Sequence, residues 1–223
     1  MGRALAVQLA SDYDEVLLGS REKQKAEKVV SELIDKGRGR DKEDLKEKLK
    51  PATNEEVARS SDIVFATLPA KHAVSEIREL VGQFRGDQIL ISTAAPTPKL
   101  GKDFLPSIGG EPPGSIARRI KEELLPRSVK VAAAFQTVPA DTLLEEGRID
   151  ADVAVSCDDE ETYGKVAKIV EKIDGLRPLY LGTLEVSGVL EGLTSVLLNV
   201  GEHNHIKSPT IKFNGTTEGK EEE

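Results

Sequence analysis

One stretch near the start of the chain decides the predicted fold: Glu15-Val16-Leu17-Leu18-Gly19-Ser20-Arg21-Glu22-Lys23-Gln24-Lys25. Its apolar run ends at Gly19. The hydroxyl of Ser20 and the guanidinium of Arg21 follow, and the ammonium of Lys25 comes one helical turn later. In dinucleotide-binding folds the end of the second strand faces the adenosine ribose, where an acid binds the hydroxyls of NAD and an Arg accommodates the 2′-phosphate of NADP. Ser20, Arg21 and Lys25 offer donors and positive charge to such a phosphate. The stretch therefore predicts an NADP(H) site.

Composition narrows the class of protein. The 223 residues suffice for one large domain, or for a mononucleotide-binding fold with a small second domain. A net charge of -8, with basic and acidic residues interspersed, argues against general nucleic-acid binding. The single cysteine, Cys157, suits a reducing cytosol, and no apolar run approaches the roughly 20 residues of a membrane helix. We expect a soluble, cytoplasmic α/β protein with no nucleic-acid or membrane partner.

The beginning of the chain predicts an incomplete dinucleotide fold. Such a fold opens with a strand, passes through a G-x-G-x-x-G turn and then enters its first helix, whereas residues 2–10 already have helical spacing. The distance from Gly2 to Ser20 fits one helix plus one strand, so we predict that Gly2 is the last glycine of that turn and lies at the cofactor. The first strand would then lie outside the chain as given, through a start codon placed too far downstream or a real truncation. We favour the misplaced start, because the rest of the sequence is locally consistent.

The remaining pattern alternates strands and helices, as an α/β fold requires. Strands are predicted at 16–18, 62–68, 88–93, 130–135, 152–156 and 178–182, and helices at 2–10, 22–34, 54–58, 71–84, 116–125, 158–173 and 184–202. Residues 35–50 are predicted to form a charge-rich, partly helical connection, and residues 101–114 an irregular loop. The last helix is apolar on all sides, which indicates a core position or a subunit contact. We predict a Rossmann-like, N-terminally incomplete NADP-binding domain over 1–128, a smaller C-terminal α/β domain over 129–213 and a disordered acidic tail over 214–223.

Several motifs occur together in this sequence: Gly19-Ser20-Arg21 with Lys25, Leu68-Pro69 with His72-Ala73, Phe135-Gln136-Thr137-Val138-Pro139-Ala140, Asp174-Gly175-Leu176-Arg177-Pro178-Leu179, Glu191-Gly192-Leu193-Thr194 and Leu198-Asn199. By these motifs the sequence resembles the F420-dependent NADP reductases, archaeal and actinobacterial oxidoreductases that transfer a hydride between NADP(H) and the deazaflavin coenzyme F420. The resemblance extends from Gly2 to about Phe213. It implies NADP(H) as cofactor, coenzyme F420 as co-substrate and a homodimer formed through the C-terminal helices.

The resemblance also implies roles for individual residues. Ser20, Arg21 and Lys25 would hold the 2′-phosphate, and Ala70, Val74 and Thr97 would lie along the dinucleotide. Ala140 would close on the nicotinamide, while the Gln136-Thr137-Val138 turn would support the deazaflavin. Gln136 stands where the family often has a histidine, which leaves that side chain's role open.

The chemistry requires positioning more than proton transfer. Two ring carbons must be held roughly 3–3.5 Å apart in a dry site, so no catalytic side chain is expected. Thr137, Val138 and Pro139 are expected to position the rings. No metal site is predicted, because His203 and His205 lack a third ligand nearby.

Two alternatives stay open on the sequence. The missing glycine-rich turn is compatible with a degenerate NADP(H)-binding relative or sensor that lacks the activity. The chain could also reduce a small imine or keto substrate with NADPH, in which case His72 is the histidine placed to donate a proton. A solvated strand-end turn at Ser20-Arg21 and a buried structural role for Cys157 are the simpler interpretations of those residues.

Overall fold

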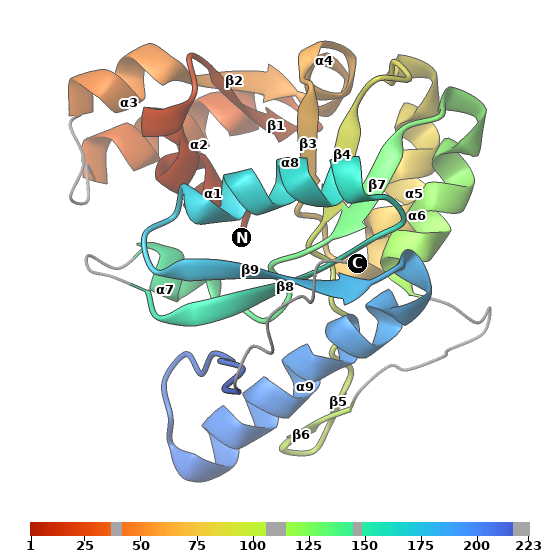
Figure 1. Ribbon diagram of the computed structural model, residues 1–223. Helices are drawn as coiled ribbons and strands as arrows, with labels where there is room; N and C mark the ends of the chain where they lie inside the picture. The colour runs from red at the N-terminus through yellow and green to blue at the C-terminus, as the bar shows by residue number, and fades with distance from the viewer. Residues whose placement is uncertain (37–41, 106–114, 145–148, 216–223) are drawn as a thin grey trace, which may run out of the picture.

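Two groups of parallel strands organise the chain in the computed structural model, which describes residues 1–36, 42–105, 115–144 and 149–215 (Figure 1). In the first group β1 (Val16–Ser20) pairs in parallel with β2 (Leu49–Thr53). The second is a five-stranded sheet in the order β3-β4-β7-β8-β9, formed by Ile63–Ala66, Ile89–Ser92, Lys130–Ala133, Ala151–Cys157 and Leu176–Gly182. Among the described strands of this five-stranded sheet, only β7 and β8 pair antiparallel. The predicted α/β class is confirmed.

Helices cover both faces of the sheet. They are α1 (Gly2–Leu9), α2 (Lys23–Lys36), α3 (Lys42–Lys48), α4 (Asn54–Ser60), α5 (Ala70–Leu80), α6 (Ile116–Leu124), α7 (Ala140–Leu144), α8 (Glu160–Glu171) and α9 (Ser187–Asn204). Alternate residues of β4 point into different cores: Ile91 packs with α1 and α8, whereas Leu90 packs with α5 and α6. The sheet is thus a middle layer between helices (Figure 1).

Local sequence explains where the helices at the sheet edge begin. Thr53 and Glu56 form a capping box at α4, with the Thr53 hydroxyl accepting from the Glu56 N–H at 3.1 Å and the Glu56 carboxylate accepting from the Thr53 N–H at 2.7 Å. Ser115 caps α6, and Asp159 caps α8. These caps fix the turns through which the strands enter the helices.

The structure corrects the prediction in three places. The connection at 35–50 contains α3, as its predicted partly helical character allows, but β2, into which it leads, was not predicted as a strand because it contains Lys50 and Pro51. The short helix α7 and the hairpin β5–β6 (Lys99–Leu100 and Asp103–Phe104) were also missed. The strand predicted to reach residue 135 ends at Ala133, since the backbone at Phe135 turns to a φ of 70°.

The long C-terminal helix is only partly buried. Leu190 and Glu191 are covered, but Val189, Val196 and Val200 are exposed on another face of α9. Residues Leu184–Asn204 are long and apolar enough to cross a membrane by length and composition alone, a test that core helices of soluble proteins also pass. Part of the loop predicted at 101–114 and the tail from residue 216 lie outside the described residues, and the division at 128 stays a prediction.

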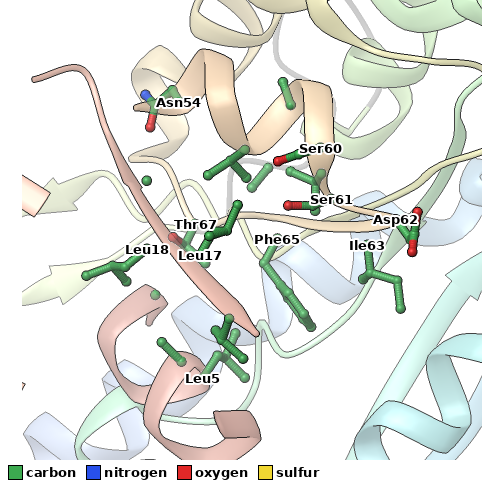
Figure 2. A pocket seen from close by; sticks show the side chains of 18 of the residues that line it. Leu5, Leu17, Leu18, Asn54, Ser60, Ser61, Asp62, Ile63, Phe65 and Thr67 are labelled. Atoms are coloured by element: carbon green, nitrogen blue, oxygen red, sulfur yellow. The ribbon is translucent and has the colours of Figure 1, made fainter. Parts of the chain in front are cut away.

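Between β1 and β3 the sheet is interrupted. Among the described residues, β1 pairs only with β2 and β3 only with β4. The space between them is a cavity of about 450 Å³ that we call the β1–β3 slot, lined along β1 by Val16–Gly19 and along β3 by residues 63–68. Figure 2 shows Leu5, Leu17 and Phe65 around this space.

Candidate functional site

A second and larger pocket opens at the carboxyl ends of the sheet strands. It has a volume of about 880 Å³ and is lined by the segments that follow β3, β4 and β7, including Leu68, Ala94 and Phe135. Residues of α9 and the segment from His205 to Pro209 form its opposite wall. Open α/β sheets bind ligands in the crevice outside the carboxyl ends of their strands. We call this cavity the carboxyl-end pocket.

The turn after β7 provides one wall of this pocket. Phe135 takes a positive φ of 70°, and the Val138 N–H donates to the Phe135 carbonyl at 3.2 Å, which closes the turn. Gln136, Thr137 and Val138 are all buried, at 5, 4 and 2 % exposure. A turn closed and buried in this way holds its side chains in a fixed position along the pocket wall.

Gln136 is held at both ends and still carries one free acceptor. Its side-chain Nε2 donates to the Ser92 backbone carbonyl at 3.0 Å, and the backbone carbonyl of Gln136 accepts from the Thr194 hydroxyl at 2.9 Å. Within the described chain, its buried Oε1 has no hydrogen-bond partner. Because buried acceptors are normally satisfied, an unpaired oxygen on a residue that lines a pocket fits a ligand that brings an N–H or O–H donor.

The opposite wall is held by polar contacts that α9 makes with distant segments. Asn199 Oδ1 accepts from the Phe104 N–H and its Nδ2 donates to the Phe104 carbonyl, both at 2.7 Å, which fastens the β5–β6 hairpin to the helix. At Gly201 a Cβ would lie 2.9 Å from the Ile206 carbonyl oxygen, so only glycine lets the 206–209 segment pack this closely. Sequence reasoning missed the contact between Asn199 and Phe104, since these residues lie 95 positions apart in the chain.

Glu191 anchors the other end of α9. Its carboxylate accepts from the Ile116 and Ala117 N–H groups at 3.0 and 3.1 Å, at the N-terminus of α6. Burial raises the pKa of this carboxyl, while the two backbone donors oppose that rise. Glu191, which belongs to one of the sequence motifs, therefore fastens α9 to α6. Its role is to hold the two helices together.

The residues predicted to bind a 2′-phosphate lie apart from the carboxyl-end pocket. Ser20 ends β1 and Arg21 follows it, with 76 % of the Arg21 side chain exposed. Arg21 Nη1 lies 3.5 Å from Glu76 Oε1 on α5, and Lys25 Nζ lies 2.6 Å from Glu22 Oε1. The guanidinium and the ammonium are thus both surface groups that an anion from solvent can reach.

The structure brings together only some of the predicted site residues. Ala70, Thr137, Val138 and Pro139 line the carboxyl-end pocket, whereas Gly2 lines the β1–β3 slot. Thr67 and Leu68 line both cavities, so the two adjoin. The other candidates line neither: Ser20, Arg21, Lys25, Val74, Thr97, Ala140 and His72.

Titratable and metal-binding chemistry is sparse in the part of the chain that the structure describes. It contains no group of three His, Cys, Asp or Glu side chains that could hold a metal ion. Burial raises the pKa of the Cys157 thiol to about 11, so the buried sulfur remains a thiol at neutral pH. Cys157 does not line the carboxyl-end pocket, whose ionisable lining side chains are Asp141, Glu202, His205 and Lys207.

Proteins of known family are similar in sequence to this chain over most of its length. Residues 1–96 match a family model described as NADP oxidoreductase, coenzyme F420-dependent. The F420-dependent NADP reductase of Methanothermobacter thermautotrophicus is 31 % identical, over 97 % of this chain and 91 % of that protein. The chain belongs to the F420-dependent NADP reductase family. The enzyme of the same name from Methanocaldococcus jannaschii is 30 % identical, over 95 % of this chain and 92 % of its own length.

Solved structures are similar to this chain in fold. A crystal structure described as a putative F420-dependent NADP reductase from Arthrobacter superposes with a TM-score of 0.77, at 18 % identity and over 96 % of this chain and 94 % of that one. An imine reductase from Bacillus cereus superposes less closely, with a TM-score of 0.60, at 16 % identity and over 90 % of this chain and 57 % of that one. Both likenesses concern the Rossmann-like fold.

Proposed function

We propose that this member of the F420-dependent NADP reductase family transfers a hydride between NADP(H) and coenzyme F420. The observation that carries the proposal is the carboxyl-end pocket, whose wall from Gln136 to Pro139 is rigid and mostly buried and whose volume of about 880 Å³ lies in the range of cofactor sites. The bound cofactors supply the redox chemistry, in which NADPH and one proton reduce the oxidised deazaflavin. The protein excludes water and orients the rings.

Residues from several segments of the chain would hold NADP(H). Ser20, Arg21 and Lys25 would bind the 2′-phosphate through donors and charge. The first turn of α1 carries no acidic residue and has N–H groups without helical partners, which suits the pyrophosphate next to Gly2. Ala70, Val74 and Thr97 would lie along the dinucleotide, and Ala140 would lie at the nicotinamide end.

Gln136 and the turn after it would hold the deazaflavin. The unpaired Oε1 of Gln136 fits a donor on the ring system or on the carboxamide of the other cofactor. Thr137, Val138 and Pro139 present small side chains, which would let two rings approach face to face. No side chain in this set needs to change its protonation state for the hydride to move.

We further propose that the enzyme is a soluble, cytoplasmic homodimer without nucleic-acid or membrane partners. The exposed apolar face of α9, with Val189 at 55 % and Val196 at 50 % exposure, supports a subunit contact through this helix. Sedimentation of the purified protein over a range of concentrations tests the oligomeric state. A monomer at all concentrations would contradict the dimer.

The activity is tested by mixing the purified chain with NADPH and oxidised F420 and following the loss of deazaflavin absorbance. We expect rapid bleaching with NADPH and slow bleaching with NADH. Binding of NADPH without bleaching, with a sample whose folding is confirmed by circular dichroism, would favour a nucleotide-binding relative without the activity. Reduction of small imines that is lost in His72→Gln would instead favour the imine or keto reductase, although His72 is exposed and lines neither cavity.

A further inference from the structure

The chain after α9 lines the carboxyl-end pocket and then returns to the five-stranded sheet. We call residues 205–213 the C-terminal strap. Its first half, from His205 to Pro209, lines the pocket on the side opposite the turn after β7. In Figure 1 the dark blue segment after α9 turns back toward β8. The shape of the pocket on this side therefore depends on how the strap is held.

The end of α9 holds the strap at its beginning. The helix ends at His205, which takes a left-handed φ of 56°, and the Ile206 N–H then donates to the Gly201 carbonyl at 3.1 Å. Pro209 packs against the same turn, since a Cβ on Gly201 would lie 3.4 Å from the proline ring. The pocket-lining half of the strap thus starts from a fixed point.

Two side chains of the sheet hold the other end of the strap by its backbone. Asp152 Oδ2 accepts from the Phe213 N–H at 2.6 Å, and Arg177 Nη2 donates to the Phe213 carbonyl at 2.7 Å. The Asp152 N–H also donates to the Ile211 carbonyl at 2.9 Å. Asp152 in β8 and Arg177 in β9 are partners in the strand register, and two hydrogen bonds of 2.8 and 2.7 Å join their side chains. We call this pair the Asp152–Arg177 clamp.

The contacts of the clamp indicate that it fixes the geometry of the strap. Asp152 is only 1 % exposed, and a buried carboxylate is tolerated only when its partners satisfy it, as the three hydrogen bonds from Arg177 and Phe213 do here. The strap also contains two non-glycine residues in the left-handed region, His205 and Ser208, whose φ is 50°. Such conformations persist only where the surrounding structure holds them. The strap is therefore held in its shape at both ends.

We propose that Asp152 and Arg177 are positioning residues for the deazaflavin, and that they act through the C-terminal strap. This inference rests on the proposed function, in which the ring lies between the turn after β7 and the wall formed by α9 and the strap. Neither side chain lines the pocket, so each acts on the ligand through the backbone that it holds. The clamp gives a role to Arg177, whose motif from Asp174 to Leu179 has no part in the site itself.

Preorganisation of the strap acts on affinity. A ligand binds more weakly in proportion to the fraction of protein that lacks the binding-competent wall, and saturation with the ligand restores that wall. Loss of the clamp should therefore raise KM for F420 and change kcat much less. NADPH affinity should change little, because the residues proposed for the 2′-phosphate lie at the end of β1, in the other group of strands.

The test compares Arg177→Ala and Arg177→Lys with the parent enzyme. Alanine removes the guanidinium, whereas lysine keeps the charge but loses the planar fork that reaches Asp152 and Phe213 together. If the competent wall falls to about a tenth of the molecules, KM for F420 rises about tenfold in Arg177→Ala, with kcat within about twofold of the parent value. Arg177→Lys should restore part of the affinity, and the Kd for NADPH should stay at the parent value in both variants.

Two control variants separate positioning from a general loss of stability. Asp150→Asn breaks the exposed ion pair between Asp150 and Lys212 of the strap and leaves the clamp intact. Val166→Ala opens a cavity at a buried position of α8 that lines neither pocket, and it should lower Tm. Both controls should keep KM for F420 at the parent value.

Hydrogen exchange tests the clamp without any cofactor. The amides of Phe213 and Asp152 both donate within the clamp region, to the Asp152 carboxylate and to the Ile211 carbonyl. In Arg177→Ala their exchange should accelerate by about tenfold, while the buried β4 residues Leu90 and Ile91 keep the exchange rates of the parent. Local acceleration of this kind distinguishes a loosened strap from a destabilised fold.

The outcomes that would overturn the proposal are distinct from those that would contradict the activity. An unchanged KM for F420 in Arg177→Ala would overturn it, as would an equal rise in Val166→Ala. Unchanged exchange at Phe213 and Asp152, or an equal acceleration in β4, would show that Arg177 does not hold the strap in particular. A parent enzyme that neither binds nor reduces F420 would contradict the proposed function, and the exchange measurement would still decide whether the clamp holds the strap.

Discussion

Arg21 Nη1 lies 3.5 Å from Glu76 Oε1, so the guanidinium at the end of β1 is paired with a carboxylate on α5. The pair joins the segment that follows β1 to the helix that follows β3. With 76 % of the Arg21 side chain exposed, the ion pair itself adds little to stability. The ion pair matters for binding, because a bound phosphate would compete with the Glu76 carboxylate for the N–H donors of Arg21.

Arg21→Ala is expected to weaken NADPH binding and leave NADH binding almost unchanged. The loss should be about 1.5–3 kcal/mol, the range for a hydrogen bond to a charged group, which is roughly 10- to 150-fold in Kd. Fluorescence titration of both nucleotides measures it. Equal losses for NADPH and NADH would remove Arg21 from the phosphate site.

Glu76→Gln is expected to tighten NADPH binding several-fold. The substitution keeps the shape of the side chain and frees the guanidinium from its carboxylate partner. It also removes a negative charge that would repel the phosphate. The same titration at low and high salt measures the effect, which should shrink as salt screens the charges. Weaker binding of NADPH would mean that Glu76 orients Arg21 for the phosphate.

Gln136→Leu is expected to raise KM for F420 or NADPH about tenfold, the cost of a lost hydrogen bond to a ligand. Thr142→Val is the matched control, since the Thr142 hydroxyl is the other buried side-chain oxygen without a partner in the described part of the chain and does not line the carboxyl-end pocket. That control should leave KM unchanged and stability equal or higher. A KM equal to that of the parent in Gln136→Leu would show that Oε1 has no ligand partner.

Asp152→Asn is expected to lower the free energy of unfolding at pH 7 by about 1–3 kcal/mol. Arg177 donates two hydrogen bonds to the buried Asp152 carboxylate, at 2.8 and 2.7 Å, and the Phe213 N–H donates a third at 2.6 Å. Arg177 keeps the pKa of Asp152 below its ordinary 3.8. The carboxylate therefore stabilises the fold above pH 3.8, and that contribution is lost as the pH falls through the lowered pKa.

Urea unfolding at pH 7 and at several values below pH 4 measures this difference. Asp150→Asn provides the control, since Asp150 pairs with Lys212 and both side chains are well exposed, at 68 and 45 %. We expect it to change stability by less than about 0.5 kcal/mol. A difference between the parent and Asp152→Asn that stays constant with pH would contradict the role of the charge.

Cys157 is expected to resist alkylation while the protein is folded. Its sulfur is buried, and a pKa of about 11 leaves almost no thiolate at pH 8. Incubation with iodoacetamide followed by intact-mass measurement should show modification only after denaturation. Rapid labelling of the native protein would contradict the burial of this strand end.

The sequence analysis succeeded where the determining signals are local. The run from Val16 to Arg21 carries an apolar strand and the basic Arg21 within six residues, and the structure forms β1 there, although the strand continues through Gly19 to Ser20. β2 was missed because Lys50 and Pro51 argue against a strand, although both are acceptable at an outer edge. The Asn199 contact with the β5–β6 hairpin depends on residues about 95 positions apart, which periodicity cannot detect.

The position of α9 has a mechanical consequence. One face of this helix forms a wall of the carboxyl-end pocket, and another presents Val189, Val196 and Val200 to solvent. A helix transmits an axial displacement along its whole length, and slippage by one residue is 1.5 Å. Productive alignment of reacting groups tolerates only about 0.5 Å. A second subunit packed on these valines would therefore fix the position of α9 and with it the spacing of the rings. If dilution separates the subunits, the apparent affinity of the enzyme for the deazaflavin should change.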